Sequence, residues 1–118
     1  MRPLSHPARE DISVEGILHA LSDPVRARIY AEIAQAECPQ ICSAFLTMSD
    51  RVVPKSTLSQ HFKVLREAGL IRSERRGVEL QNTVRQEDNH DRFGKLIQAI
   101  MQAHKEQLER QRRTRRKR

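Results

Sequence analysis

Residues 56–67 combine apolar side chains at helical spacing with polar side chains of the types that read nucleic acid. Leu58, Phe62 and Leu65 recur at i, i+4 and i+7, so they share one face of a helix. The polar residues turn to the other side: Ser56, Ser59, Gln60, Lys63, Arg66 and Glu67. Gln suits adenine, Lys suits guanine or phosphate, and Ser and Thr bond to bases or phosphates. We therefore expect one packed face and one face that binds a nucleic-acid partner.

Local chemistry places both ends of this helix. Pro54 biases Val53 toward an extended conformation, and Gly69 supplies a left-handed stop. The roughly 13 residues between them span about 20 Å, which fits the DNA major groove. For His61, beside the apolar seam, a phosphate contact and a packing role both stay open. The expected DNA-contacting residues of this helix are Lys55, Ser56, Thr57, Ser59, Gln60, His61 and Lys63.

Two short strand-like runs follow Gly69, and a glycine-containing turn separates them. Residues 70–74 and 78–84 have strand character, and Arg75, Arg76 and Gly77 form the turn. The sequence therefore predicts a β-hairpin with a basic tip directly after a helix-turn-helix, which is a winged helix. The hairpin arginines Arg72, Arg75 and Arg76 are expected to meet phosphates beside the groove.

Two blocks of the sequence closely resemble the ArsR/SmtB-type winged-helix transcriptional regulators. They are Ala20-Leu-Ser-Asp-Pro-Val-Arg-Ala-Arg-Ile29 and Ser56-Thr-Leu-Ser-Gln-His-Phe-Lys-Val-Leu-Arg-Glu-Ala-Gly-Leu-Ile71. The resemblance runs from about residue 15 to about residue 105, and its second block is long and ungapped. It implies a small homodimeric repressor that binds a double-stranded DNA operator and leaves it when an effector binds. The expected fold class is mainly α with a small β-hairpin, a winged helix-turn-helix with an additional C-terminal dimerisation helix.

Three shorter helices are expected before residue 50. The apolar residues of residues 14–21 mark the first, and Asp23 followed by Pro24 is a start signal for the second, whose buried stripe is Val25, Ile29 and Ile33. A third short helix is expected over residues 41–46. Residues 47–54 then form a longer turn before the recognition helix.

The last helix is expected over residues 88–109. It carries a broad apolar stripe, made of Phe93, Leu96, Ile97, Ile100, Met101, His104 and Leu108. This stripe exceeds what a small domain needs, so we expect it to form a homodimer interface, although a helix that only caps its own domain stays open. A dimeric winged helix predicts a palindromic site with half-sites roughly 10 base pairs apart.

The net charge of +7 has a local source. Seven of the 22 Lys and Arg residues lie in residues 110–118, which leaves 15 basic residues against 15 acidic residues in the remainder. The chain is expected to divide into a flexible lead-in (1–11), a DNA-binding domain (12–87), the dimerisation helix (88–109) and a basic disordered tail (110–118). The tail either aids solubility or touches flanking DNA.

Cys38 and Cys42 are the thiols of the chain. Many sensors of the resembled family hold thiophilic metals in this region, but the spacing here is Cys-x-x-x-Cys with Pro39 inside, not the Cys-x-Cys of the arsenic and cadmium sensors. Three roles stay open for them: a packing role as small hydrophobes, redox sensing through a disulfide, and a share of a metal site.

A second partial metal motif lies on the last helix. Asp88, His90 and His104 echo the ligands that zinc sensors of the resembled family share across their dimer, but Met101 stands where another histidine is expected. Methionine is a poor zinc ligand. His104 on the apolar stripe equally suits an interface histidine. We therefore expect no required cofactor.

An enzymatic function is not expected. The sequence holds no glycine-rich phosphate loop, no Gly-x-Ser-x-Gly motif and only four glycines. The alternative to operator binding is a winged-helix adaptor that binds RNA or a protein partner. No apolar run of about 18 residues and no apolar signal core is present, so we expect a cytoplasmic protein without a membrane partner.

Overall fold

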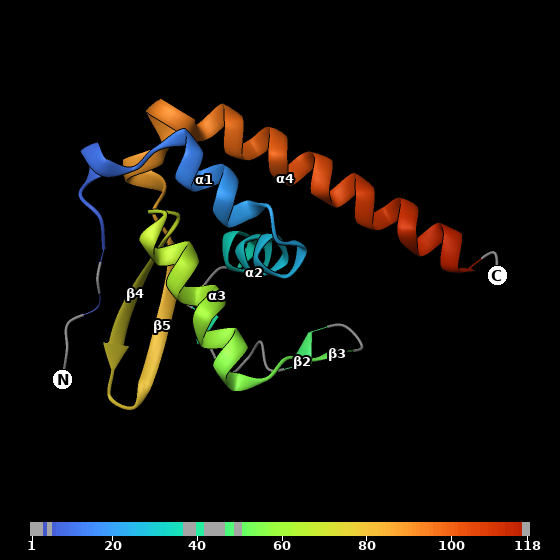
Figure 1. The fold of residues 1–118 in the computed structure, drawn as a ribbon, viewed down its shortest axis with the longest axis horizontal. Coiled ribbons are helices and arrows are strands. Elements are labelled where there is room, and N and C mark those ends of the chain that lie inside the picture. The colour runs from blue at the N-terminus through green and yellow to red at the C-terminus, as the bar shows by residue number, and fades with distance from the viewer. Residues whose placement is uncertain (1–3, 5, 37–39, 42–46, 49–50, 117–118) are drawn as a thin grey trace.

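The computed structural model describes residues 4, 6–36, 40–41, 47–48 and 51–116, and the elements below refer to that part of the 118-residue chain. Figure 1 shows α4 as a long arm that passes over the other helices, with the β4–β5 hairpin at the opposite side. The elements are η1 (Arg9–Asp11), α1 (Val14–Leu21), α2 (Pro24–Gln35), β1 (Gln40–Ile41), β2 (Thr47–Met48), β3 (Arg51–Val52), α3 (Lys55–Glu67), β4 (Ile71–Arg76), β5 (Glu79–Val84) and α4 (Gln86–Arg116).

Side-chain caps start the first two α-helices. The Ser13 hydroxyl accepts a hydrogen bond from the Gly16 amide at 3.0 Å. The Asp23 carboxylate accepts from the amides of Val25 and Arg26 at 2.8 and 3.2 Å, with Pro24 at the first helical position. These groups satisfy backbone donors that have no partner inside a helix, so the predicted starts at residues 14 and 24 are confirmed.

The sheet has three strands in the order β1-β5-β4, and its main part is the predicted hairpin. β4 and β5 pair antiparallel, with Ile71 opposite Val84 and Arg76 opposite Glu79. Gly77 at the turn has a φ of 64°, a conformation that glycine adopts without strain. Sequence patterns therefore located both strands of the wing, but Arg75 and Arg76, expected in the turn, belong to β4 and pair with Leu80 and Glu79.

The sequence predicts a short helix over residues 41–46, but the first residue of this range is not helical. Ile41 lies in β1 and pairs with Gln81 of β5, and residues 42–46 lie outside the described part. β5 has an edge that can pair with another strand, and isoleucine is β-branched and suits a strand. The periodicity of one segment cannot predict pairing between segments that lie far apart in the sequence. The expected turn over residues 47–54 contains a second short ladder, in which β2 pairs with β3.

The core lies where α1, α2, α3 and the base of the hairpin meet. The predicted seam of α3 is confirmed, since Leu58, Phe62 and Leu65 are all at most 2% exposed. α4 adds Ile97 to the same cluster. The largest fully buried apolar side chains are Phe62, Ile17, Ile29, Leu58, Leu65, Leu70 and Ile71. Burial of this seam fixes the rotation of α3 about its own axis, because the polar face must then point outward.

Gly69 ends α3 as predicted, in the left-handed conformation with a φ of 82°. The Leu70 amide donates to the Leu65 carbonyl at 3.1 Å and closes the last turn. A Cβ atom at residue 69 would lie 2.4 Å from Cγ1 of Ile12, so the segment before α1 packs directly on this glycine. The helix end is therefore fixed by both conformation and close approach.

α4 extends beyond both of its predicted ends, from Gln86 to Arg116. The tail expected to be disordered from residue 110 is therefore helical as far as residue 116. A helix that is already formed can be extended without a new nucleation step, and Arg and Gln are good helix formers. Basic residues in the last turn also interact favourably with the helix dipole.

Replacing Gly69 by Ala tests the helix end. We expect Gly69→Ala to lower the free energy of unfolding by at least about 2 kcal/mol, since it adds backbone strain to a clash with Ile12. Gly77→Ala is the matched control, because it has a similar φ but nothing within 4 Å of the added Cβ, and should cost only about 1 kcal/mol. Urea unfolding measures both, and equal losses would contradict the packing role of Gly69.

Candidate nucleic-acid interface

One face of α3 is exposed and carries the predicted reading residues. Ser56, Ser59, Gln60 and Lys63 recur at i, i+3, i+4 and i+7, and all four are exposed. Lys55 and Thr57 at the start of the helix are also exposed. The structure thus brings six of the seven helix residues expected to contact DNA to the surface of α3.

His61 is placed differently from its polar neighbours. The side chain is half-buried, and its Nδ1 atom is enclosed without a hydrogen-bond partner among the described residues. One ring nitrogen therefore lies in the interior beside the seam. This geometry favours the packing role, and a phosphate contact by the other nitrogen stays a prediction.

A buried polar chain joins α3 to the hairpin. Nη1 of Arg66 donates to the Ser73 hydroxyl at 3.2 Å, and that hydroxyl donates to Oδ1 of Asn82 at 2.7 Å. Ser73 and Asn82 are 3% and 0% exposed. A satisfied polar chain of this kind fixes the helix relative to the hairpin. Sequence reasoning missed Asn82, whose inward orientation follows only from the register of Asn82 with Ser73.

The three hairpin arginines have different surroundings. Nη2 of Arg72 lies 3.1 Å from Glu87 and 3.3 Å from Asp88, so this guanidinium is directed to the start of α4. Arg76 pairs with exposed Glu74 at 3.2 Å. Arg75 is exposed and makes no ion pair within the described chain. By strand alternation Arg75 shares a face with Ser73, which contacts α3. Arg75 is therefore the hairpin cation placed to act together with α3, whereas Arg72 departs from its expected position.

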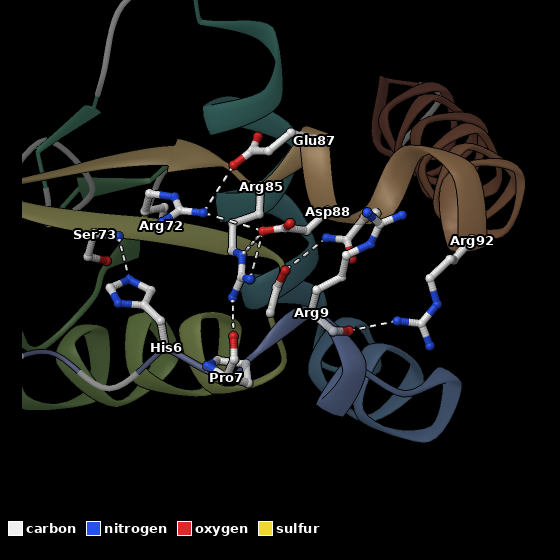
Figure 2. Close-up of polar contacts among 11 residues, drawn as sticks. His6, Pro7, Arg9, Arg72, Ser73, Arg85, Glu87, Asp88 and Arg92 are labelled. Carbon is white, nitrogen blue, oxygen red and sulfur yellow. Dashed lines mark hydrogen bonds and ion pairs between the residues drawn. The ribbon is translucent and has the colours of Figure 1, made fainter.

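Arg85 organises the junction between the hairpin and α4 (Figure 2). Its side chain is only 5% exposed, and its Nε and Nη2 atoms donate to Oδ2 of Asp88 at 3.0 and 2.7 Å. Nη1 donates to the Pro7 carbonyl at 2.8 Å. The hydrogen bond from Arg85 lowers the pKa of the Asp88 carboxyl, a shift that its partial burial opposes and that the charges of Arg85, Arg72 and Arg9 reinforce. A buried guanidinium needs such partners, because an unpaired charge is costly to desolvate.

The N-terminal segment lies against this junction and is not a flexible lead-in where the structure describes it. Nε2 of His6 accepts a hydrogen bond from the Ser73 amide at 3.0 Å, and Nη1 of Arg92 donates to the Arg9 carbonyl (Figure 2). β4 is an edge strand, so its outward amides need partners from outside the sheet. Burial, followed by the charges of Arg66, Arg72 and Arg85, lowers the pKa of His6, which keeps Nε2 unprotonated as an acceptor.

The candidate metal ligands are not assembled in the described part of the chain. Within residues 4, 6–36, 40–41, 47–48 and 51–116, no group of three His, Cys, Asp or Glu side chains is placed to hold a metal ion. Asp88, expected in the partial zinc motif, is bound by Arg85 and Arg72 instead. Cys38 and Cys42 lie outside the described residues, so their packing, redox and metal roles stay predictions.

The apolar stripe of α4 is incompletely covered in one chain. Ile97 is 7% exposed, but the six other stripe residues are only half-buried: Phe93, Leu96, Ile100, Met101, His104 and Leu108. No helix in the part of the chain that the structure describes is both long and apolar enough to cross a membrane.

The comparisons with known proteins agree with this geometry. Residues 21–74 match the family model of a helix-turn-helix domain, which here extends from the end of α1 into β4. The structure is similar to that of an ArsR-like transcriptional regulator from Rhodococcus sp. RHA1, with a TM-score of 0.56 and 21% identity over 85% of this chain and 90% of that chain. The search of curated proteins gives no match. The winged helix-turn-helix fold expected from the sequence is therefore confirmed.

The Arg85–Asp88 pair predicts a specific pH dependence of stability. Because the folded-state pKa of Asp88 is lowered, its contribution is complete above the unfolded-state pKa of about 3.9 and is lost as pH falls through the folded-state value. We expect Asp88→Asn to be less stable at neutral pH and to lose less stability than the wild type on acidification below about pH 4.

The control is Glu87→Gln, which removes a neighbouring carboxylate that contacts only Arg72 in the described chain. Urea unfolding at a series of pH values measures all three proteins. An Asp88→Asn curve parallel to that of the wild type would show that this pair does not carry the acid dependence.

Proposed function

We propose that this protein is a homodimeric, sequence-specific DNA-binding transcriptional regulator that inserts α3 into the major groove. The observation that carries the proposal is the division of α3 into a buried seam and an exposed face. That face carries Ser56, Ser59, Gln60 and Lys63. A helix of 13 residues is about 20 Å long, which suits one major-groove contact.

The charge distribution around α3 supports the same placement. Lys55 and Lys63 are exposed on the helix, and Arg75 extends the basic surface onto the hairpin. Phosphate contacts by such cations position a protein on the duplex, while Gln60 offers an amide that suits an adenine edge. Hairpin and helix are held together by the Arg66–Ser73–Asn82 chain, so the two parts meet DNA as one rigid surface.

The dimer in the proposal rests on α4. The half-buried side chains of Phe93, Leu96 and Ile100 on α4 would be covered by the same residues of a second copy, as a two-fold symmetric interface requires. Two copies of α3 then read half-sites about one helical turn of DNA apart. The resemblance to ArsR/SmtB-type proteins supports repression in the cytoplasm by operator occlusion, with release by an effector, and it supports a non-enzymatic role.

Operator binding is tested by selecting promoter fragments with the purified full chain and measuring their affinity by fluorescence anisotropy. We expect Gln60→Ala or Lys63→Ala to weaken specific binding by about 1–3 kcal/mol where the side chain contacts a base. Where the lost contact is to a phosphate, we expect the slope of log affinity against log salt concentration to fall in magnitude by about 1. Lys95→Ala, an exposed charge change on α4, is the control. No preference for any fragment over scrambled duplex would contradict the proposal and favour an RNA or protein partner.

The dimer interface is tested by Ile100→Glu. Ile100 is half-buried on α4, and a glutamate there would have to be desolvated when two copies associate. We expect the dimer dissociation constant, measured by sedimentation, to rise by at least about 10-fold.

The matched control is Ala99→Glu, which places the same charge one residue away at an exposed position. Thermal unfolding shows whether each variant remains folded. A folded Ile100→Glu protein with unchanged dimer affinity would exclude this face of α4 as the interface.

A further inference from the structure

A groove with a volume of about 860 Å³ lies between α2 and α4. In Figure 1 the middle of α4 passes above α2. Residues of both helices line the groove, from Arg28 to Gln35 on α2 and from Gln86 to Arg112 on α4. Ligand sites for small molecules commonly have volumes of about 300–1,000 Å³ and often lie between packed helices. The volume is therefore suited to an organic molecule and exceeds what a single ion needs.

The lining of the groove combines a cation from α2 with a neutral hydrogen-bonding group from α4. Arg28 is half-buried and makes no hydrogen bond or ion pair within the described chain. Burial, and then the nearby charge of Arg28, lowers the pKa of His104, so its imidazole is neutral at pH 7. Nε2 of His104 is buried without a hydrogen-bond partner in the described chain. With its proton on Nε2, the imidazole can donate to an anion that Arg28 binds.

The other charges that line the groove do not cancel Arg28. Glu32 and Glu109 are exposed, as are Lys105 and Arg112, so these four groups are largely screened by solvent. Arg28 and His104 are half-buried and are screened less, and the net charge of this pair is positive. A carboxylate there would satisfy both an unpaired guanidinium and an unpaired imidazole nitrogen.

Apolar side chains also line the groove. Ile97, Met101 and Leu108 line the α4 wall, and Tyr30 lines the α2 wall. Tyr30 is 4% exposed, and burial raises its pKa to about 12, so it presents an uncharged ring. The lining thus fits a molecule with one anionic group and an apolar body.

We infer that the groove between α2 and α4 binds a small organic carboxylate, with the carboxylate on Arg28 and His104 and the apolar body along Met101 and Ile97. Resting on the proposed function, this assigns the groove as the effector site. α4 carries both His104 and Asn89, and Asn89 donates to the carbonyl of Gly69 at the end of α3. A change in the spacing of α2 and α4 on ligand binding therefore reaches the recognition helix, and occupancy weakens operator binding.

The probe is octanoate, titrated into the full chain by calorimetry, with 1-octanol as its neutral counterpart. We expect octanoate to bind at least about 10-fold more tightly than octanol, and Arg28→Met to remove at least about 10-fold of the octanoate affinity. Lys95→Met removes one exposed charge from α4 outside the groove and should leave the affinity unchanged. Thermal unfolding reports whether each variant is folded, and the octanol comparison does not depend on any variant.

Any of three results would overturn the site. Octanoate and octanol could bind equally tightly, Arg28→Met and Lys95→Met could lose the same octanoate affinity, or octanoate could fail to bind. Binding by folded, monomeric Ile100→Glu but not by the wild-type dimer would also overturn it, since a second copy would then fill the groove. Ile100 does not line the groove, so this variant leaves the site intact.

The effector role has a separate readout. Octanoate should release the wild-type protein from its selected promoter fragment and should not release Arg28→Met. Octanoate binding without any change in DNA affinity would keep the site and exclude the effector role. Failure of the protein to prefer any DNA fragment would instead remove the proposed function, while the calorimetry still decides whether the groove binds a carboxylate.

Discussion

A buried hydrogen bond 2.8 Å long, from Asn89 Nδ2 to the carbonyl oxygen of Gly69, joins the end of α3 to the first turns of α4. Asn89 is 3% exposed, so this hydrogen bond is shielded from water. A buried carbonyl without a hydrogen-bond partner would be costly. Gly69 has the left-handed conformation, and the next two residues, Leu70 and Ile71, are buried in the core at the start of the wing. The direction of α3, and hence of its reading face, depends on this connection.

The basic residues of the molecule divide into those with structural partners and those without. Arg72 and Arg85 bind the carboxylate of Asp88 at the junction of hairpin and α4. Lys63 and Arg75 are exposed and make no ion pair in the described chain, so their charges are available to phosphates. Sequence alone cannot make this division, because it depends on which carboxylate the fold brings near each cation. The exposed surface of α3 and the wing therefore differs from the junction of hairpin and α4, because cations such as Lys63 and Arg75 have no ion-pair partner there within the described chain.

Sequence patterns predicted the elements whose determinants are local. The cap at Asp23, the seam of α3, the stop at Gly69 and the hairpin turn at Gly77 each depend on residues within one turn of the feature. Most of the reading face followed as well, since exposure on a helix follows from periodicity once the buried side is known. The expected exposed residues Ser59, Gln60 and Lys63 are exposed in the structure.

Features that depend on distant parts of the chain were not predictable in this way. Ile41 pairs with β5, and His6 binds the amide of Ser73, across long stretches of sequence. α4 continues beyond its expected end at residue 109, because a formed helix extends through good helix formers even where residues 110–116 are strongly basic. The half-buried position of Arg28 in the groove likewise required the packing of α4 on α2.

Amide chemical-shift mapping of the labelled protein, with and without its selected promoter duplex, tests the central claim most directly. The account predicts the largest shifts at residues 55–63 of α3 and at residues 75–78 of the wing, with little change along the buried seam or on α1. Shifts confined to the basic end of α4, or identical shifts with scrambled duplex, would contradict a recognition role for α3.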